Sequence, residues 1–563
     1  MLTFSHDPKI AEQQMDAMVF SLTTFGYIDG DFDDAEKDFV RDYIRKLVTH
    51  RVDTGMPNAT PAVREDLVAR FTTHFLEKFE AIDAHVRELF TEPIAEGDDR
   101  NLFVHAKLKQ RCFEIFQAFD RASQDAILET VDELIHADGH VHPAEAKFRS
   151  ELAGLLGAEL DIELIDSEDD SPRASITTPI AHKADGDHPF FKQFEHHYSA
   201  DPAKISKQVA ADLALVDRMV DALEERRQTG NGKLDGKRGV AELEPGARFL
   251  DGWVHVVMPE PGRAYELLVL GDLHGCYSCL KGALMQDRFF EKVEAYRRAP
   301  DASPYPLLVL LGDYIDRGIF SLNGVLRAVL QLATTAPEHV IALRGNHEYY
   351  VEVKGNIYGG VRPAEAINTL KPHLPIEVFR NYMRLFDALP NYLLFGRTFF
   401  VHGGIPRDRT IKERWKDLSS LNDADLRFQA MWSDPSSADV IPAALQEQTA
   451  RFPFGRLQFQ SFMQRLGCRT LVRGHEKVDE GFRRVYDDEA GLLVTLFSAG
   501  GKTNADLPEE SSYRSVTPMA LRLHHGADGT STLTPMAIDW ESFNDPDRNA
   551  FFQKPLEIEH KAD

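Results

Sequence analysis

The spacing of apolar residues changes once along the chain, and this change divides the sequence into two regions. Up to about residue 157, apolar residues recur three or four positions apart, as in Met15, Met18, Val19 and Leu22, which is the period of an amphipathic helix. From about residue 247, short β-prone apolar runs alternate with helix-like stretches. The pattern therefore predicts an all-α N-terminal domain followed by an α/β domain.

The apolar runs of the second region have the length and composition of buried strands. They cover residues 266–270, 307–311, 340–343, 398–401, 470–472 and 492–497. The first five runs each end at a short polar motif that contains glycine. Because α/β sheets bind ligands at the carboxyl ends of their strands, we expect these motifs to converge on one site.

The five motifs supply side chains of the kinds that bind metal ions. They read GDLHG (271–275), GDYIDRG (312–318), GNHE (345–348), HGG (402–404) and RGH (473–475). Aspartate and histidine together suit manganese, iron or zinc better than calcium or magnesium, which prefer oxygen ligands alone. We expect two metal ions, manganese first with iron and zinc as alternatives. The candidate ligands are Asp272, His274, Asp313, Asn346, His402 and His475.

The order and wording of these motifs resemble the PPP family of metal-dependent serine/threonine protein phosphatases. MWSDP at residues 431–435 resembles a further segment of that family, and the resemblance covers about residues 247–505. It implies a calcineurin-like β-sandwich flanked by helices around a dinuclear centre. It also implies that Asp272, His274 and Asp313 bind one metal ion, and that Asp313, Asn346, His402 and His475 bind the other.

Two segments depart from the family pattern, and both concern the substrate groove. Where the family continues with Ser-Ala-Pro-Asn-Tyr, this chain reads FSAGGKTN at residues 497–504, without the tyrosine. The stretch 354–375, which follows GNHE, is also longer than usual.

The resemblance implies hydrolysis of phosphoserine and phosphothreonine monoesters by a hydroxide that two metal ions activate. Because the leaving alkoxide needs a proton, we expect His347 to act as general acid, with Asp316 orienting its ring. Arg317 and Arg344 suit bidentate phosphate binding. Arg451, upstream of the Phe-Gly pair at 454–455, is a candidate for a further phosphate contact.

Two other functions remain open at this point. The first is a nucleotide hydrolase, as in the related diadenosine tetraphosphate hydrolases, although the Asp316-Arg317 pair and Glu348 favour the protein phosphatase. The second is a signalling scaffold with a vestigial phosphatase core, which the intact ligand and acid positions disfavour.

A short repeat occurs in the helical region. Residues 29–36 (DGDFDDAE) and 138–145 (DGHVHPAE) share an Asp-Gly turn and an Ala-Glu pair that begins the next helix, and they resemble the TerB family. The first copy also resembles the start of an EF-hand. Its sixth and twelfth positions, Asp34 and Val40, lack the required glycine and glutamate, so only a looser cation site stays open.

These patterns predict four segments along the chain. They are a TerB-like helical domain that binds a protein partner (1–157), an acidic linker and helical connector (158–246), a metallophosphatase catalytic domain (247–540) and a poorly packed polar tail (541–563).

Composition limits the classes of partner that the protein is expected to bind and the cellular compartment in which it is expected to act. With 64 Lys and Arg against 90 Asp and Glu, the net charge of −26 disfavours binding to nucleic acid or anionic membranes. The four cysteines are too few for a disulfide framework, and we read the pair Cys276 and Cys279 as small residues packed in a helix, with a redox switch as the alternative. We see neither a signal peptide nor a run of about 20 apolar residues, so we expect a cytoplasmic protein. We also expect a bacterial origin for the phosphatase.

Overall fold

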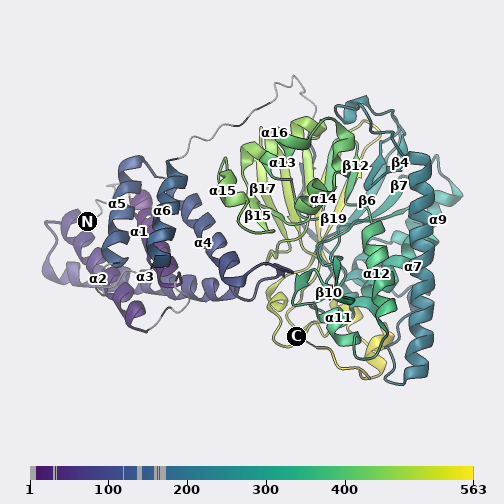
Figure 1. Ribbon diagram of the computed structural model, residues 1–563, viewed down its shortest axis with the longest axis horizontal. Helices are drawn as coiled ribbons and strands as arrows, with labels where there is room; N and C mark the ends of the chain where they lie inside the picture. Colours follow the sequence, from purple (N-terminus) through teal and green to yellow (C-terminus); the bar gives the residue numbers. More distant parts are fainter. Residues whose placement is uncertain are drawn as a thin grey trace. The chain divides into compact units, whose positions relative to one another are not determined.

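The computed structural model describes residues 8–28, 32, 34–117, 119–135, 143–157, 162, 164 and 173–561. The chain forms two compact units (Figure 1). The first contains residues 1–161 together with 436–453, and the second contains residues 162–435 and 454–563. The chain therefore leaves the second unit once, at residue 436, and returns to it at residue 454.

The first unit is helical, which confirms the predicted helical N-terminal region. Its long helices are α1 (Pro8–Gly26), α2 (Asp34–Gly55), α3 (Pro61–Leu89), α4 (Arg100–Gln117), α5 (Arg121–Ile135) and α6 (Pro143–Leu156). The residues at helical spacing are the buried ones, for example Met18, Val19 and Leu22 on α1. Phe25 meets Phe148 edge-on with ring centroids 5.2 Å apart, which joins α1 to α6.

The Asp-Gly repeat falls largely outside the described residues. Residues 29–31, 33 and 138–142 belong to the undescribed part of the chain, and so does most of the acidic stretch 161–172. The resemblance to the TerB family and the loose cation site therefore both stay predictions.

The segment 436–453 completes the core of the first unit, although the sequence places it inside the catalytic domain. It contains the short helix α15 (Ala443–Gln446). Ala438, Ile441 and Leu445 are buried in the same apolar cluster as the helices of the first unit. The hydroxyl of Ser436 donates to Glu114 at 2.5 Å. The predicted continuous domain 247–540 is thus interrupted by residues that fold with the helices.

Two mixed sheets form the centre of the second unit. In the described part of the chain, one sheet has the order β17-β18-β16-β13-β12-β5-β4 and the other has the order β2-β20-β19-β6-β7-β8, with β3 beside β20. The strands of the first are β4 (Arg248–Asp251), β5 (Val254–Val257), β12 (Tyr392–Phe395), β13 (Thr398–Val401), β16 (Thr470–Arg473), β17 (Phe482–Asp488) and β18 (Gly491–Leu496). Those of the second are β2 (Ser175–Ile176), β3 (Ile180–Ala181), β6 (Tyr265–Leu270), β7 (Tyr305–Leu310), β8 (Val340–Ala342), β19 (Met519–His525) and β20 (Ser531–Ala537).

The continuous apolar runs exist because both faces of the central strands are buried. On β6, Leu267 and Val269 face the interior between the two sheets, whereas Leu268 and Leu270 face a layer of helices. Side chains alternate along a strand, so a strand covered on both faces needs apolar residues at every position. Strands β6, β7 and β8 are parallel to one another, and their carboxyl ends therefore lie at one edge.

Helices cover both outer faces of the sandwich (Figure 1). One helical layer shares an apolar cluster with the β6 sheet, and it contains α7 (Pro202–Gly230), α8 (Tyr277–Gln286), α9 (Phe289–Arg298), α10 (Arg327–Thr335) and α12 (Ile376–Ala388). The other shares a cluster with the β13 sheet, and it contains α13 (Asp408–Arg414), α14 (Ala424–Ala430) and α16 (Arg456–Leu466). The α/β domain with mixed sheets confirms the α/β class that was predicted for this region.

Two segments differ from the sequence expectation for domain boundaries. The described part of the predicted connector, from residue 173 on, is built into the second unit, because β2 and β3 pair with β20 and α7 packs on β4, α10 and α12. The tail from residue 541 is also packed, since Phe543 and Phe551 are buried in the main core. A few buried aromatic side chains are enough to anchor such a segment to the core. The prediction missed them because it was based on the polar composition of the tail as a whole. No helix among the described residues is both long and apolar enough to cross a bilayer.

Candidate metal centre

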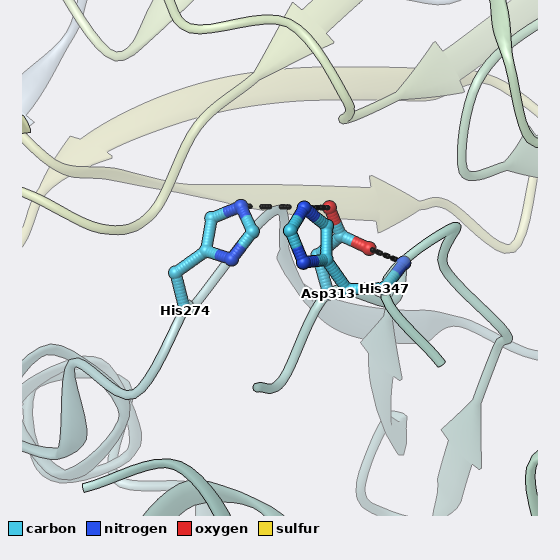
Figure 2. A group of neighbouring side chains, drawn as sticks. All are labelled: His274, Asp313 and His347. Atoms are coloured by element: carbon cyan, nitrogen blue, oxygen red, sulfur yellow. Dashed lines mark hydrogen bonds and ion pairs between the residues drawn. The ribbon is translucent and has the colours of Figure 1, made fainter. Parts of the chain in front are cut away.

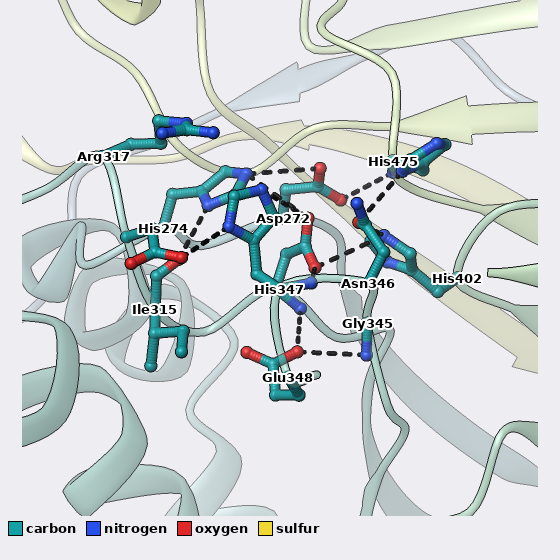
Figure 3. A network of polar contacts seen from close by, with 12 residues as sticks. Asp272, His274, Ile315, Arg317, Gly345, Asn346, His347, Glu348, His402 and His475 are labelled. Atoms are coloured by element: carbon teal, nitrogen blue, oxygen red, sulfur yellow. Dashed lines mark hydrogen bonds and ion pairs between the residues drawn. The ribbon is translucent and has the colours of Figure 1, made fainter. Parts of the chain in front are cut away.

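Five loops bring the predicted site residues to one place in the second unit (Figure 3). The loops after β6, β7 and β8 carry GDLHG, GDYIDRG and GNHE, and those after β13 and β16 carry HGG and RGH. The first three strands belong to one sheet and the last two to the other. The site therefore forms where the carboxyl ends of strands from both sheets meet.

Asp313 lies at the centre of this arrangement. Its Oδ2 is 3.4 Å from Nε2 of His274, and its Oδ1 is 3.4 Å from Nε2 of His402. Two groups of metal-binding side chains share it: one adds His274 and His347 (Figure 2), and the other adds His402 and His475. Within each group the candidate ligand atoms lie within 4.8 Å of one another.

Asp272 and Asn346 complete the predicted set of six. Oδ2 of Asp272 lies 3.7 Å from Nε2 of His274, and its Oδ1 accepts the backbone N–H of His475 at 2.8 Å. The side chain of Asn346 lies 2.8 Å from Nε2 of His402 and 3.1 Å from Nδ1 of His475. All six predicted ligands thus lie in the same cluster. His347, which was predicted as the general acid, also lies among these candidate ligand atoms.

Backbone carbonyls set the orientation of two histidine rings. Nδ1 of His274 donates to the carbonyl of Ile315 at 2.9 Å, and Nδ1 of His402 donates to that of Leu311 at 3.1 Å. Each ring is left with Nε2 directed at the Asp313 carboxylate, as in protein metal sites, where the second ring nitrogen is held by an outer partner. Burial lowers the pKa of both histidines, which keeps them neutral and able to act as ligands.

The charges of the cluster fit a bound cation. Burial, together with the charge of Asp313, raises the pKa of Asp272 to about 7. No described residue donates a hydrogen bond to the buried Oδ2 of Asp272. The buried guanidinium of Arg473 is paired with Asp434 at 2.9 Å, and its charge offsets the rise in the pKa of Asp272 only in part. A buried carboxylate oxygen without a partner is costly, and a metal ion is the kind of group that would satisfy it.

The backbone at the site is strained and tightly packed. His274, Asp313 and His475 have φ angles of 41°, 55° and 71°, in a region that side chains other than glycine rarely adopt. A Cβ at Gly345 would lie 2.1 Å from Oδ1 of Asp313, so only glycine fits there. Strain of this kind persists where surrounding contacts hold it, as is common at functional sites.

Glu348 holds two of the loops together, a role that sequence reasoning missed. Its carboxylate accepts backbone N–H groups of Asp313 at 2.7 Å, Tyr314 at 2.8 Å and Gly345 at 3.0 Å. Burial and the nearby charge of Asp313 raise the pKa of Glu348 to about 8. The signal in the sequence that could have pointed to it is a glutamate directly after the candidate acid His347, within the GNHE motif.

The predicted acid pair is adjacent to the cluster. Nδ1 of His347 lies 2.7 Å from Oδ2 of Asp316, and Oδ1 of Asp316 accepts the N–H of Ala366 at 2.8 Å. Burial raises the pKa of Asp316 to about 6, against the opposing charge of Arg317. The Nε2 atom of His347 is 4.0 Å from Oδ2 of Asp313 and therefore faces the cluster.

The predicted phosphate-binding arginines lie in the second unit near these loops. Arg317 is paired with Glu365 at 2.7 Å. Arg344 donates from Nε to the carbonyl of Glu348 at 2.9 Å and pairs with Asp387 at 2.9 Å. Both guanidiniums are largely buried, Arg317 with 12% and Arg344 with 6% of its side chain exposed.

Arg451, the third predicted phosphate ligand, folds with a different unit from Arg317 and Arg344. It belongs to the first unit, where its guanidinium lies 3.4 Å from Glu92. Its spacing from the Phe-Gly pair at 454–455, on which the prediction rested, crosses the boundary between the units. The segment 436–453 packs with the helices of the first unit, and the role of Arg451 as a phosphate contact stays a prediction.

Two further features concern residues around the cluster. The ring of Tyr513 lies 5.3 Å from that of His274 and 5.1 Å from that of Phe497, so an aromatic side chain borders the site from a position that the FSAGGKTN run did not indicate. Cys276 and Cys279 are buried, and burial raises the pKa of the Cys276 thiol, which disfavours a reactive thiolate.

Comparison with known proteins finds phosphoesterases and phosphatases that are similar to the part of the chain that carries the five motifs. Residues 265–479 match the model of the calcineurin-like phosphoesterase family. A probable serine/threonine-protein phosphatase of Encephalitozoon cuniculi is 28% identical over 261 residues, which are 46% of this chain and 51% of that protein. The serine/threonine-protein phosphatase 4 catalytic subunit of Eremothecium gossypii is 27% identical over 235 residues, which are 41% of this chain and 67% of that protein.

The chain spans about half to two thirds of the length of these relatives. Among solved structures, a Saccharomyces cerevisiae protein serine/threonine phosphatase with similarity to human phosphatase PP5 is 17% identical. The similarity covers 58% of this chain and 89% of that one, with a TM-score of 0.37, a value that supports no structural inference.

Proposed function

We propose that this chain, which contains a calcineurin-like metallophosphoesterase domain homologous to PPP-family serine/threonine protein phosphatases, hydrolyses phosphoserine and phosphothreonine monoesters in proteins. The observation that carries the proposal is the position of Asp313. Its two carboxylate oxygens each face a different group of histidines, and the His347–Asp316 pair lies beside it. This is the arrangement that a phosphate ester held between two cations and a proton donor requires.

The candidate ligands would hold two metal ions, manganese first or iron and zinc, and these ions would lower the pKa of a bound water and neutralise phosphoryl oxygens. Neutral histidines and a shared aspartate suit these borderline metals. The ligand assignment is Asp272, His274 and Asp313 for one ion, and Asp313, Asn346, His402 and His475 for the other.

His347 supplies the proton for the leaving group in this proposal. Asp316 accepts from Nδ1 of the ring and stabilises its protonated form, so that Nε2, which faces the cluster, donates to the serine or threonine oxygen as the ester bond breaks. Without such a proton the product would be a strongly basic alkoxide. The burial of both side chains keeps water from competing for that proton.

The arginines orient the phosphate. Arg317 and Arg344 carry fixed positive charge, and a planar guanidinium can bind two phosphoryl oxygens at once. Both side chains are largely buried beside the cluster loops, so a bound phosphate would be held in a region of reduced dielectric, where charged hydrogen bonds are stronger.

Two proposals concern the rest of the protein. We infer that the substrates are phosphoproteins, in keeping with the relatives named as protein phosphatases, and that the helical unit binds a partner protein in the cytoplasm. The net charge of −26 supports the proposal that the protein does not bind nucleic acid.

Parallel assays test the proposed function. The purified protein is given a phosphoserine peptide, p-nitrophenyl phosphate and diadenosine tetraphosphate, and its metal content is measured by elemental analysis. We expect about two metal ions per chain and turnover of the first two substrates. Much faster turnover of diadenosine tetraphosphate would indicate a nucleotide hydrolase, and full metal loading without any turnover would indicate a scaffold.

A further inference from the structure

Two consecutive residues of the GDYIDRG loop are in a strained conformation. Asp316 and Arg317 have φ angles of 68° and 65°, and neither is glycine. A single residue of this kind costs on the order of 1 kcal/mol or more, so two in succession need contacts that hold them in place. Both residues belong to the proposed catalytic machinery, Asp316 as the partner of His347 and Arg317 as a phosphate ligand.

Besides His274 and His347, the stretch 354–375, which the sequence marks as unusually long, supplies contacts that hold this loop. It contains β10 (Asn356–Gly359), β11 (Val361–Arg362) and α11 (Glu365–Leu370). The first two residues of α11, Glu365 and Ala366, contact the two strained residues in the opposite order along the chain. The N–H of Ala366 donates to Asp316 at 2.8 Å, and the carboxylate of Glu365 pairs with Arg317.

The ion pair uses only one edge of the arginine. Nη1 of Arg317 donates to both carboxylate oxygens of Glu365, at 2.7 and 2.8 Å, and to the carbonyl of Pro363 at 3.1 Å. The backbone N–H of Arg317 lies 3.4 Å from the same carboxylate. Nη2 of Arg317 is also buried, and no described residue accepts a hydrogen bond from it.

A buried guanidinium nitrogen without an acceptor is expensive to maintain. Burial by itself would lower the pKa of Arg317, and the charge of Glu365 more than reverses that effect. The charge of Glu365 therefore offsets the cost of burying the charged guanidinium of Arg317. The N–H groups of Nη2 stay available to donate to an anion. A phosphoryl group has acceptor oxygens of the kind that such donors bind.

We propose that Glu365 is a positioning residue, which holds Arg317 by its Nη1 edge and presents the Nη2 edge to the phosphoryl group of the substrate. This inference rests on the proposed phosphatase function. It assigns to the stretch 354–375 the task of setting the geometry of phosphate binding. Glu365 itself touches Arg317 and not the reacting atoms.

The matched pair of variants is Glu365→Gln and Glu352→Gln. Each change removes the negative charge of a glutamate that pairs with an arginine. Glu365 pairs with Arg317 at the site, and Glu352 pairs with Arg380 at 2.7 Å on the surface. We expect Glu365→Gln to raise KM for p-nitrophenyl phosphate and the inhibition constant of inorganic phosphate about tenfold, with kcat changed less than about threefold. Glu352→Gln should leave all three unchanged.

A double-mutant cycle shows whether Glu365 acts through Arg317. If it does, Glu365→Gln should add little to the loss already caused by Arg317→Ala, because the residue that it positions is gone. Additive losses, or a Glu365→Gln variant with the KM and phosphate affinity of the wild type, would overturn the inference. A lower KM in that variant would do the same, since it would show that Glu365 opposes phosphate binding.

A measurement without turnover separates this inference from the proposed function. Inorganic phosphate that binds the folded protein raises its melting temperature, and we expect a clearly smaller rise in Glu365→Gln than in the wild type. A wild type that binds phosphate in this way but hydrolyses no phosphoester would defeat the proposed function and leave the role of Glu365 standing. Equal rises in the two proteins, or none in either, would defeat the role of Glu365. The melting temperature without phosphate reports whether the variant is folded.

Discussion

At the scale of single residues, the site depends on a few side chains that each serve more than one loop. Asp313 connects the two histidine groups, and Glu348 ties the Asp313 loop to the Gly345 loop through three backbone N–H groups. Because these residues are buried and share partners, changes at different positions should affect different properties. Loss of a ligand should affect metal binding, loss of the acid should affect turnover, and loss of Glu348 should affect stability.

The first prediction separates the acid from a ligand. His347→Ala should retain most bound metal and lose about 10²- to 10⁴-fold in kcat, which is the usual contribution of general acid catalysis. Asp313→Asn should lose metal as well as turnover, because one of its oxygens becomes an amide nitrogen. Elemental analysis and steady-state assays check both. The control is His373→Ala, at an exposed histidine outside the cluster. Equal metal loss in the two site variants would contradict the assignment of His347.

The second prediction concerns Glu348. Glu348→Gln keeps the shape of the side chain but replaces one acceptor oxygen by an N–H donor, which would face a backbone N–H. We expect a loss of about 1–3 kcal/mol in the free energy of unfolding of the second unit, measured with urea. The control Glu377→Gln, at a side chain that is 68% exposed, should change stability by less than about 0.5 kcal/mol. A Glu348→Gln variant as stable as the control would show that the three contacts are dispensable.

At the scale of secondary-structure elements, burial on both faces of the central strands decides which residues they contain. The inner face of β6 packs between the sheets and the outer face packs on helices. The same environment also buries His255 on β5, which is 3% exposed and has a buried Nδ1 without a partner among the described residues. Burial, with the charges of Arg248 and Arg226 adding to it, lowers the pKa of His255 well below its ordinary value.

The third prediction follows from this neutral histidine. Below about pH 6.5 the unfolded chain binds a proton at His255 that the folded chain does not, so stability falls as the pH falls. Between pH 7.5 and pH 5.5 this one residue should cost about 1.4 kcal/mol. His255→Leu should remove that part of the loss, as measured by urea unfolding at the two pH values. His524→Leu, at an exposed position, should leave it intact. An unchanged loss in His255→Leu would mean that the histidine becomes protonated in the folded state.

At the scale of the whole molecule, the two units are not simply consecutive along the chain. The helical unit takes residues 436–453 from within the sequence of the phosphoesterase unit. Ala438, Ile441 and Leu445 complete its core, so residues 1–161 by themselves lack part of their packing. The segment begins directly after β14 (Ser433–Pro435), whose Asp434 pairs with Arg473 of the RGH motif.

The fourth prediction tests this composite helical unit. Ile441 is 1% exposed, so Ile441→Asp buries a charge or expels the segment. We expect the helical unit to lose about 3 kcal/mol or more of stability, seen as faster hydrogen exchange in peptides from α1 and α4. Ser437→Asp, at an exposed position of the same segment, is the control and should have little effect. Unchanged exchange in Ile441→Asp would show that the segment is not part of that core.

The sequence by itself determined the class of each region and the members of the candidate site. Apolar spacing is a local property, and it correctly separated helices from doubly buried strands. The motifs identified the six cluster residues and the His347–Asp316 pair because strands of a sheet deliver their carboxyl ends to a common edge.

Only the tertiary structure decided which residues hold the site in shape and where the units divide. The roles of Glu348, Glu365 and Tyr513 arise from contacts between loops that are distant along the chain, and the removal of Arg451 to the helical unit follows from the packing of 436–453. Packing between distant segments depends on three-dimensional complementarity and leaves no period or spacing in the sequence. The members of the candidate site can therefore be recognised from local motifs, whereas the residues that hold them in place cannot.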